Sequence, residues 1–435
     1  MKAKFAVRHH MAGSGPGPRR DPLDGMGPSA ILPGYQMEAR KRSFADAIFF
    51  LLGVAVLVSG CKGYTNRLVL DPAPAVARLR AGGALQAEVD CLARPLVANR
   101  EVFNLAVGVL TPDGAVHNFS YGRAPLPAPD TIFEIGSLTK VFVAGLVAML
   151  VEEGRLRYED TVRDLLPPAV KVSADVGRLT VHQLVTHTSG MPRQPNNLAQ
   201  MRYFVDFVFA GRNPYAYLNR RSLFSYLRHS RLKPTPEPRY AYSNLGYGLL
   251  GELIEIKTGR PLPELVEEKI CGPLQLHNTG YSLTGPQRAR LAAGHVGDQP
   301  KFLRRNRPLR DWNQSGAMEG SGGLYSTVND LMLFAQSNLG LPGQPLAARL
   351  AAMQAVQIQT PTEDVTAGWV VNHYADWDTS IHYMNGVFAG YSAYLGMDLR
   401  KRVAVVVLTS NFNWTDKLGH NLVLRLAAAT AVSER

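Results

Sequence analysis

Two pairs of short apolar segments, one near each end of the chain, predict β-hairpins. In the first pair, residues 103–110 and 116–121 are separated by a Thr-Pro-Asp-Gly stretch, which has the residues of a tight turn. In the second pair, residues 391–397 and 403–408 are joined through a short Asp-Leu-Arg-Lys segment. We expect these four segments to contribute strands to one sheet.

The middle of the chain has the pattern of helices. Residues 141–153 are apolar on most sides and end at Gly154, and residues 245–257 end at Gly259, which is a typical helix stop. Residues 422–431 are a further helix candidate. The order of elements predicts an α/β (α+β) fold, in which an antiparallel sheet formed from both chain ends is flanked by helices and a mostly helical lobe is inserted. A cleft where such lobes meet is a usual place for a ligand site.

The residues before the first strands carry the features of a bacterial export signal. Within residues 37–60, an Arg-Lys-Arg triplet precedes an apolar run over 48–58, which is too short to span a hydrocarbon core of ~30 Å. The run leads into Val-Ser-Gly-Cys, which resembles the lipobox of bacterial lipoproteins and makes Cys61 a candidate for lipidation. A plain signal peptide with an incidental cysteine is the alternative.

This organisation predicts the domain boundaries and the location of the protein. Residues 1–36, rich in Gly, Pro and Arg, are a possible extension of the gene model before a true start at Met37. We expect residues 61–84 to be a tether and residues 85–435 to be the functional domain. The protein would then face the periplasm while lipid-anchored to a bacterial membrane, with the outer membrane favoured over the inner one.

Composition and charge narrow the choice of partners. The 435 residues are 46% hydrophobic and 19% charged, an ordinary globular balance, and the net charge is +12. Because the basic residues are scattered, we expect no nucleic-acid partner, and an anionic envelope surface or wall polymer suits the charge better. No Cys/His cluster has metal-ligand spacing, and we expect no cofactor. Cys91 and Cys271 could pair in an oxidising periplasm, but sequence does not decide this.

Candidate chemistry comes from a Ser-x-x-Lys spacing, which places a hydroxyl and an amine on one face of a helix. A serine needs such a neighbouring base to become a useful nucleophile. The spacing occurs at Ser59/Lys62, Ser137/Lys140 and Ser230/Lys233. Of these, the Ser137/Lys140 pair opens an apolar helix, where the helix dipole also favours developing negative charge. An ordinary N-cap serine is the competing interpretation of the motif taken alone.

The neighbouring sequence motifs favour the interpretation of Ser137 as a catalytic nucleophile. Five blocks occur in order: FEIGSLTK (133–140), LTVHQLVTHTSGMP (179–192), YSNLGY (242–247), GGLYST (322–327) and GYS (390–392). Together they resemble the serine β-lactamase and penicillin-binding superfamily, in particular class C β-lactamases, D-alanyl-D-alanine carboxypeptidases and related esterases. The resemblance runs from about residue 130 to residue 411 and implies a β-lactamase/transpeptidase-like fold.

The resemblance implies a role for each matching residue. Ser137 would be the acylated nucleophile, Lys140 would deprotonate it or hold its partner, and Tyr242 would shuttle protons. Asn244 would bind the substrate amide and Lys140. We also expect burial to lower the pKa of Lys140 and the nearby lysine to lower the pKa of Tyr242. His187, in the His-Thr-Ser-Gly block, is expected to be structural rather than catalytic.

One family motif departs from its usual pattern. Where the superfamily has Lys or His, any residue, and Gly on a strand, this chain has Met384, Asn and Gly386. The resemblance implies that the lost cation would have bound the substrate carboxylate. His382 would lie on the same strand face, and we hypothesise that it supplies the missing charge. The oxyanion hole needs only backbone N–H groups, here those of Ser137 and Val387.

These residues leave three functional hypotheses. The first is an acyl-enzyme hydrolase of cell-wall-type peptides with D-alanyl-D-alanine carboxypeptidase or β-lactamase character. The second is a carboxylesterase acting on neutral acyl substrates, which Met384 favours. The third is a non-catalytic penicillin-binding sensor, against which the presence of Ser137, Lys140 and Tyr242 argues.

Overall fold

The computed structural model describes residues 71–430, apart from residues 233–237, 313–315, 356–357, 361–363 and 414–415. The expected gene-model extension, the signal peptide, Cys61 and the first part of the tether lie outside the described residues. No helix in the described part of the chain combines the length and the apolar character that crossing a membrane requires.

The centre of the fold is an antiparallel sheet with the strand order β2-β1-β10-β9-β8-β7-β6-β5. Its strands are β1 (Asn104–Leu110), β2 (Val116–Gly122), β5 (Ile358–Gln359), β6 (Asp364–Val365), β7 (Val370–Tyr374), β8 (Thr379–Phe388), β9 (Tyr391–Asp398) and β10 (Val403–Thr409). A second, two-stranded sheet pairs β3 (Phe133–Glu134) with β4 (Tyr325–Ser326). Both predicted hairpins are present, and β1 from the first pairs directly with β10 from the second. The sheet is therefore assembled from both chain ends, as the sequence predicts.

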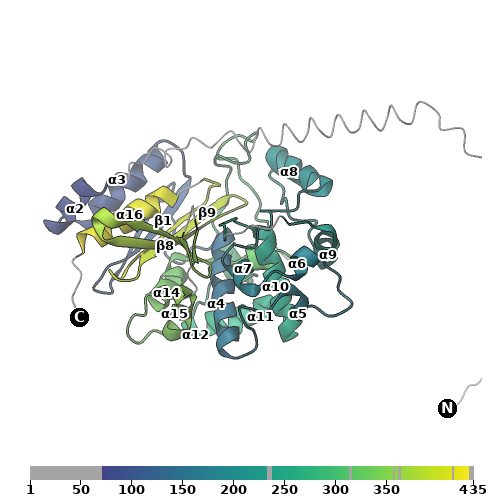
Figure 1. The fold of residues 1–435 in the computed structure, drawn as a ribbon. Helices are drawn as coiled ribbons and strands as arrows, with labels where there is room; N and C mark the ends of the chain where they lie inside the picture. The colour runs from purple at the N-terminus through teal and green to yellow at the C-terminus, as the bar shows by residue number, and fades with distance from the viewer. Residues whose placement is uncertain are drawn as a thin grey trace, which may run out of the picture. The chain divides into compact units, whose positions relative to one another are not determined.

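Helices cover both faces of the sheet and form a lobe beside it (Figure 1). The α-helices are α2 (Ala73–Arg80), α3 (Leu85–Ala98), α4 (Thr139–Glu152), α5 (Val162–Leu165), α6 (Ala174–Gly177), α7 (Val181–Val185), α8 (Leu198–Ala210), α9 (Arg220–His229), α10 (Asn244–Thr258), α11 (Leu262–Val266), α12 (Gly272–Leu274), α13 (Gly285–Ala289), α14 (Val328–Asn338), α15 (Ala347–Ala355) and α16 (Asp416–Ala429). Short 3₁₀ turns lie at η2 (Gly136–Leu138), η4 (Glu319–Ser321) and η5 (Ala375–Trp377), and a π turn at η3 (Glu267–Cys271).

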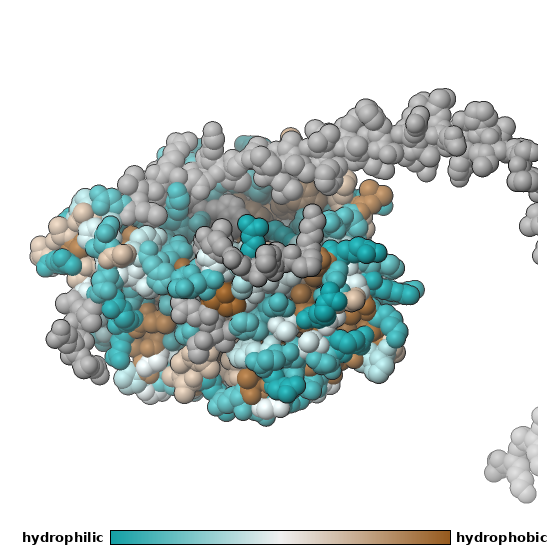
Figure 2. Space-filling view, in the orientation of Figure 1, coloured by the Kyte–Doolittle hydropathy of each residue, from teal (hydrophilic) through white to brown (hydrophobic). Residues whose placement is uncertain are grey.

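The sheet separates two apolar cores. Alternate residues of β10 point to opposite faces, so Val405 joins a cluster with α3 and α16, whereas Val406 joins a larger cluster with α4, α10 and α14. The helices that connect the early and late strands, drawn in teal in Figure 1, form the inserted helical lobe. On the face shown in Figure 2, hydrophobic residues form small groups among hydrophilic ones.

The structure corrects one expected boundary. Helix α2 lies within residues 61–84, where a tether was expected, and it packs against α16. Ala75 and Val76 are buried, and the Arg80 guanidinium donates a hydrogen bond of 2.7 Å to the Ala428 carbonyl oxygen. Because a helix of two turns is stable only through such tertiary contacts, the sequence of this segment did not reveal it. The folded domain begins before residue 85.

The two cysteines in the described residues are unpaired. Cys91 is exposed on α3, whereas Cys271 is buried at the end of η3. Burial raises the pKa of the Cys271 thiol. The structure therefore contains no disulfide between them.

Candidate active site

Ser137 lies in the 3₁₀ turn η2, at the entrance to the buried helix α4. Gly136 before it has φ +51°, and a Cβ there would lie 2.9 Å from the Val387 carbonyl oxygen, so glycine is required at this turn. Thr139 ties the turn together, because its hydroxyl donates to the Gly136 carbonyl oxygen (2.7 Å) and accepts from the Leu324 amide (3.2 Å). The residues of α4 from Thr139 to Leu150 are all buried. Ser137 is therefore held in place by a helix that is packed in the core on all sides.

Lys140 lies one helical turn beyond Ser137 and is fully buried. Its Nζ atom lies 3.0 Å from Ser137 Oγ, 2.9 Å from Asn244 Oδ1 and 2.6 Å from the Ser321 carbonyl oxygen. Burial lowers the pKa of Lys140 well below its ordinary value, and the positive charge of Arg193 lowers it further. The uncharged amine is therefore favoured in this site, as expected from the sequence.

Tyr242 reaches Ser137 from the segment before α10. Its hydroxyl donates a hydrogen bond of 2.6 Å to Ser137 Oγ. The N-cap residue Ser243 fixes this position, because its hydroxyl accepts from the Gly246 amide (2.8 Å) and donates to the Pro192 carbonyl oxygen (2.7 Å). Ser137 Oγ thus has two acid–base groups within hydrogen-bond distance, and they come from segments about a hundred residues apart.

The expected direction of the Tyr242 pKa shift was wrong. Burial raises the pKa of Tyr242 to about 12, and the opposing effects of Arg193 and of the hydrogen bond with Ser137 are smaller. The sequence suggested a nearby charged lysine, whereas Lys140 is itself driven toward the neutral form by burial. The pair is therefore a neutral amine and a neutral phenol.

Asn244 links Lys140 to a residue that the sequence did not single out. While its Oδ1 accepts from Lys140, its Nδ2 donates a hydrogen bond of 3.0 Å to the Tyr215 hydroxyl. That hydroxyl in turn donates to Gln194 Oε1 (3.3 Å). Tyr215 is half-buried, and its partial burial raises its pKa. These contacts orient the Asn244 amide so that its oxygen faces Lys140.

The free edge of β8 forms the opposite wall of the site. Strand β7 pairs with β8 only up to Tyr383, and in the described residues β8 from Met384 onward pairs on one side alone, with β9. A Cβ at Gly386 would lie 2.9 Å from the Ser137 nitrogen and would collide with the Ile135 carbonyl oxygen. Glycine thus lets the backbone of Gly386 and Val387 run directly beside the Ser137 amide, where the oxyanion hole was expected.

Met384 and His382 do not provide a cation at this wall. Met384 is 2% exposed and packs in an apolar enclosure that includes His187 and Trp369. Burial lowers the pKa of His382 to about 4, and the nearby His373 lowers it further, so the ring is uncharged at neutral pH. His382 also lies four residues from Gly386, about 13 Å along the strand. These observations argue against the hypothesis that His382 replaces the missing charge.

His187 packs under the site and makes no contact of catalytic type in the described residues. Its ring lies 4.5 Å from the Tyr242 ring between centroids, and its Nδ1 accepts a hydrogen bond of 3.1 Å from the Ser243 amide. Burial, followed by the charges of Lys140 and Arg193, lowers its pKa well below the ordinary value. This is the placement of a packing residue that supports Tyr242.

Three groups at the site were missed by the sequence analysis: Tyr215, the Ser321 carbonyl and Arg193. The Arg193 Cζ atom lies 5.0 Å from the centroid of the Tyr242 ring. Its position directly after the His-Thr-Ser-Gly-Met-Pro block was the one signal that could have drawn attention to it.

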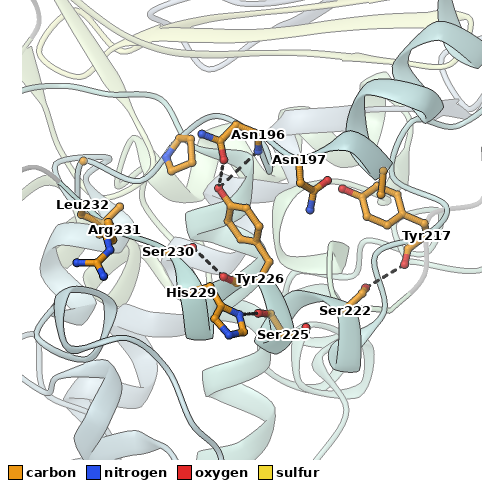
Figure 3. A pocket seen from close by; sticks show the side chains of 13 residues that line it. Asn196, Asn197, Tyr217, Ser222, Ser225, Tyr226, His229, Ser230, Arg231 and Leu232 are labelled. Atoms are coloured by element: carbon orange, nitrogen blue, oxygen red, sulfur yellow. Dashed lines mark hydrogen bonds between the residues drawn. The ribbon is translucent and has the colours of Figure 1, made fainter. Parts of the chain in front are cut away.

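A separate cavity of about 960 Å³ lies beside the site, between the loop after α7 and helix α9. Figure 3 shows Tyr226 reaching across it, with its hydroxyl donating to Asn196 Oδ1 at 2.7 Å. Gly190 and Pro192 line the cavity, but Ser137 does not. In the described part of the chain, no three His, Cys, Asp or Glu side chains are grouped so as to hold a metal ion.

The sequence of this chain is similar to those of known beta-lactamases and carboxypeptidases. Residues 89–429 match the profile of the family described as Beta-lactamase. The D-alanyl-D-alanine-carboxypeptidase/endopeptidase AmpH of Escherichia coli is 27% identical over 304 residues, which cover 66% of this chain and 73% of that protein. A beta-lactamase of Pseudomonas fluorescens is 25% identical over 262 residues, which cover 58% of this chain and 64% of that protein.

Solved structures share the fold. A class C beta lactamase from Rhodobacter sphaeroides superposes with a TM-score of 0.63 at 22% identity, covering 78% of this chain and 98% of that one. A beta-lactamase/D-alanine carboxypeptidase from Yersinia pestis, complexed with citrate, gives a TM-score of 0.62 at 23% identity, covering 79% and 97%. The helical lobe and the antiparallel sheet therefore have the architecture of class C beta-lactamases.

Proposed function

The chain belongs to the Beta-lactamase family and is a serine hydrolase, and we propose that it cleaves D-alanyl-D-alanine-type peptides or β-lactams of cell-wall character through an acyl-enzyme on Ser137. The observation that carries this proposal is the convergence on Ser137 Oγ of Lys140 Nζ at 3.0 Å and the Tyr242 hydroxyl at 2.6 Å. The names of the relatives, which include carboxypeptidases and beta-lactamases, support the substrate class.

The neutral state of Lys140 suits it to act as the base in acylation. A neutral amine has two N–H donors and one lone pair, and two of its three neighbours, Asn244 Oδ1 and the Ser321 carbonyl oxygen, can only accept. With both N–H groups used there, the lone pair is left for Ser137. Lys140 therefore takes the Ser137 proton as Oγ attacks the substrate carbonyl carbon.

The remaining proton transfers follow from the high pKa of Tyr242. The negative charge that develops on the carbonyl oxygen is stabilised by the amides of Ser137 and Val387, each donor contributing roughly 3 kcal/mol in the transition state. As the intermediate collapses, Tyr242 gives its proton to the leaving amine, and the Lys140 ammonium then restores it. Attack of water on the acyl-enzyme uses the same groups in reverse, which releases the acid and regenerates Ser137.

Incubation of purified protein with a fluorescent penicillin and with a nitrophenyl ester tests the proposal. We expect the penicillin to label the protein, and the ester to be hydrolysed, in wild type but not in Ser137→Ala. Ser230→Ala is a matched control, because Ser230 also lies in a Ser-x-x-Lys sequence but donates its hydrogen bond to the Tyr226 carbonyl oxygen. Activity retained in Ser137→Ala would refute the assignment, and stable labelling without turnover would indicate a sensor.

A carboxylesterase acting on neutral acyl substrates is the second candidate. The buried Met384 favours it, because this position lacks the cation that would bind a substrate carboxylate. Ester turnover without penicillin labelling would support this function over the first.

We also propose that the protein is a lipoprotein anchored through Cys61 and facing the periplasm. The Val-Ser-Gly-Cys sequence after a basic and apolar segment supports this. Cys61→Ala should abolish incorporation of labelled palmitate and release the protein from the membrane fraction. Cys91→Ala, which changes an exposed cysteine of the folded domain, should do neither. Membrane association of Cys61→Ala equal to that of wild type would contradict the anchor.

A further inference from the structure

Arg193 places a positive charge at the active site that no acidic side chain balances. The side chain is exposed, and its Cζ lies 5.0 Å from the centroid of the Tyr242 ring. Within the described residues Arg193 forms no ion pair, although many other arginines of the chain do. A guanidinium stacked on an aromatic ring keeps the donors at its edge available for a planar anion.

The backbone holds Arg193 to the helix that begins at the catalytic motif. Its carbonyl oxygen accepts hydrogen bonds from the amides of Asn244 (3.0 Å) and Leu245 (3.2 Å). The preceding carbonyl, that of Pro192, accepts from the Ser243 hydroxyl at 2.7 Å. Three hydrogen bonds thus fix this segment to the first turn of α10, so the guanidinium extends from a point that is rigid with respect to Tyr242.

The electrostatic effect of Arg193 reaches the reacting groups. Burial is the main cause of the lowered pKa of Lys140, and Arg193 adds to it. Arg193 also opposes the rise that burial causes in the pKa of Tyr242. No Asp or Glu is among the causes of either shift. Arg193 therefore adds positive charge beside the two proton-handling groups, which suits an anionic substrate.

We propose that Arg193 is the anion subsite of this enzyme, binding the carboxylate of a peptide's C-terminal residue or of a β-lactam. The inference rests on the proposed hydrolase function and names the substrate class of that site. In a peptide cleaved at its last bond, the carboxylate lies one residue beyond the scissile carbonyl, about 3.5 Å along the chain. A long arginine side chain anchored beside Tyr242 can reach such a group. In this protein the anion is thus recognised by Arg193 in the loop before α10. The position on β8 where the superfamily motif has a cation is occupied here by the apolar Met384.

Matched substrates that differ only in this charge test the proposal. The substrates are a tripeptide ending in D-alanyl-D-alanine and the same tripeptide with a C-terminal amide, and the readout is the ratio of their kcat/KM values. We expect wild type to prefer the free acid. Arg193→Gln should lower this ratio about 10- to 100-fold, the range for loss of one charge-assisted hydrogen-bonded pair, mainly through KM. Arg193→Lys, which keeps the charge but loses the bidentate geometry, should restore part of it.

Control measurements distinguish a failure of the anion-subsite proposal from a failure of the hydrolase proposal. Arg221→Gln removes an equal charge from an exposed position on α9 and should leave the ratio at the wild-type value. A ratio unchanged in Arg193→Gln, or an equal loss for both peptides, would overturn the anion subsite while Ser137-dependent hydrolysis of a nitrophenyl ester still supported the hydrolase. Absence of Ser137-dependent turnover of every substrate would instead overturn the hydrolase, and the subsite with it.

Discussion

Replacing Tyr242 with phenylalanine removes one oxygen atom from the active site and leaves the ring in place. The ring remains packed 4.5 Å from His187 and 5.0 Å from the Arg193 Cζ, so the surrounding contacts are retained. What is lost is the 2.6 Å hydrogen bond to Ser137 Oγ and the proton that Tyr242 gives to the leaving group. The variant therefore isolates the chemical role of the hydroxyl.

The two effects of this change differ in size. Loss of this partly buried hydroxyl hydrogen bond lowers the free energy of unfolding by about 1 kcal/mol. Loss of a positioned proton donor lowers the rate about 10²- to 10⁴-fold, which corresponds to about 3–5 kcal/mol of activation free energy. The decrease in kcat/KM should therefore greatly exceed anything that a small change in folded population could cause.

The assay compares two leaving groups. Nitrophenolate leaves without a proton, whereas a peptide amine must receive one, so Tyr242→Phe should impair peptide cleavage more than nitrophenyl ester hydrolysis. Tyr394→Phe is the control, because it removes the hydroxyl of a fully buried tyrosine that pairs with His420 in the other core (2.9 Å). We expect the melting temperature to fall at least as much in Tyr394→Phe as in Tyr242→Phe, and a large rate loss in Tyr242→Phe alone.

Two results would refute this reasoning. If Tyr242→Phe kept more than about half of the wild-type kcat/KM for the peptide, the hydroxyl would have no part in proton transfer. If peptide and nitrophenyl ester lost activity equally, the hydroxyl would position Ser137 rather than protonate the leaving group.

Three further predictions concern the pocket wall, the base and the half-buried carboxyl of Glu319. Gly386→Ala should lower ester turnover roughly 100-fold and also lower the melting temperature, because the added methyl group meets backbone atoms and pushes β8 away from the Ser137 amide; wild-type turnover would contradict the close approach. In a pH–rate profile, kcat/KM should rise as Lys140 loses its proton and level off well below pH 10.5, with no fall from Tyr242 until about pH 12; a rate that still climbs at pH 10 would exclude a neutral Lys140 as the base. Burial raises the pKa of Glu319 to about 7, so the native state binds more protons than the unfolded state between about pH 4.5 and pH 7, and the free energy of unfolding should fall as pH rises through this range. Glu319→Gln should remove that fall. If the difference between the urea midpoints of wild type and variant were the same at pH 4.5 and pH 8, the prediction would be contradicted.

The sequence predicted those elements that have a strong local pattern. The strands β1, β2, β9 and β10 and the helices α4 and α10 agree with their apolar runs and glycine stops within one or two residues. Helix α16 begins six residues before the expected position, because Gly419, His420 and Asn421 are weak helix formers and packing on the sheet stabilises them. The short strands β5 to β7 at the sheet edge carried too little pattern to be predicted.

The sequence predicted those parts of the candidate site that are made by particular side chains at a recognisable spacing or in a recognisable motif. Ser137 and Lys140 are one helical turn apart, so their contact follows from spacing, whereas the placement of Tyr242 and Asn244 beside them came from family resemblance. The Ser321 carbonyl holds Lys140 with a backbone atom, which any residue would supply and no motif reveals. The direction of the shift in the pKa of Tyr242 depends on how deeply the side chain is buried, and the sequence alone does not reveal this.

The pairing of β1 with β10 sets the order in which a working molecule can form. It joins residues roughly 300 positions apart, for example Leu105 and Thr409, so the central strand pair cannot close until the chain has been synthesised beyond β10. The same late segment contains β8, whose edge lies against Ser137. A nascent or truncated chain would carry its nucleophile and both proton carriers without the opposing wall. Hydrolytic competence should therefore arise late in folding, when β8 takes its place beside Ser137. A folded domain whose two ends were joined through a linker and whose chain was reopened in the helical lobe should regain it.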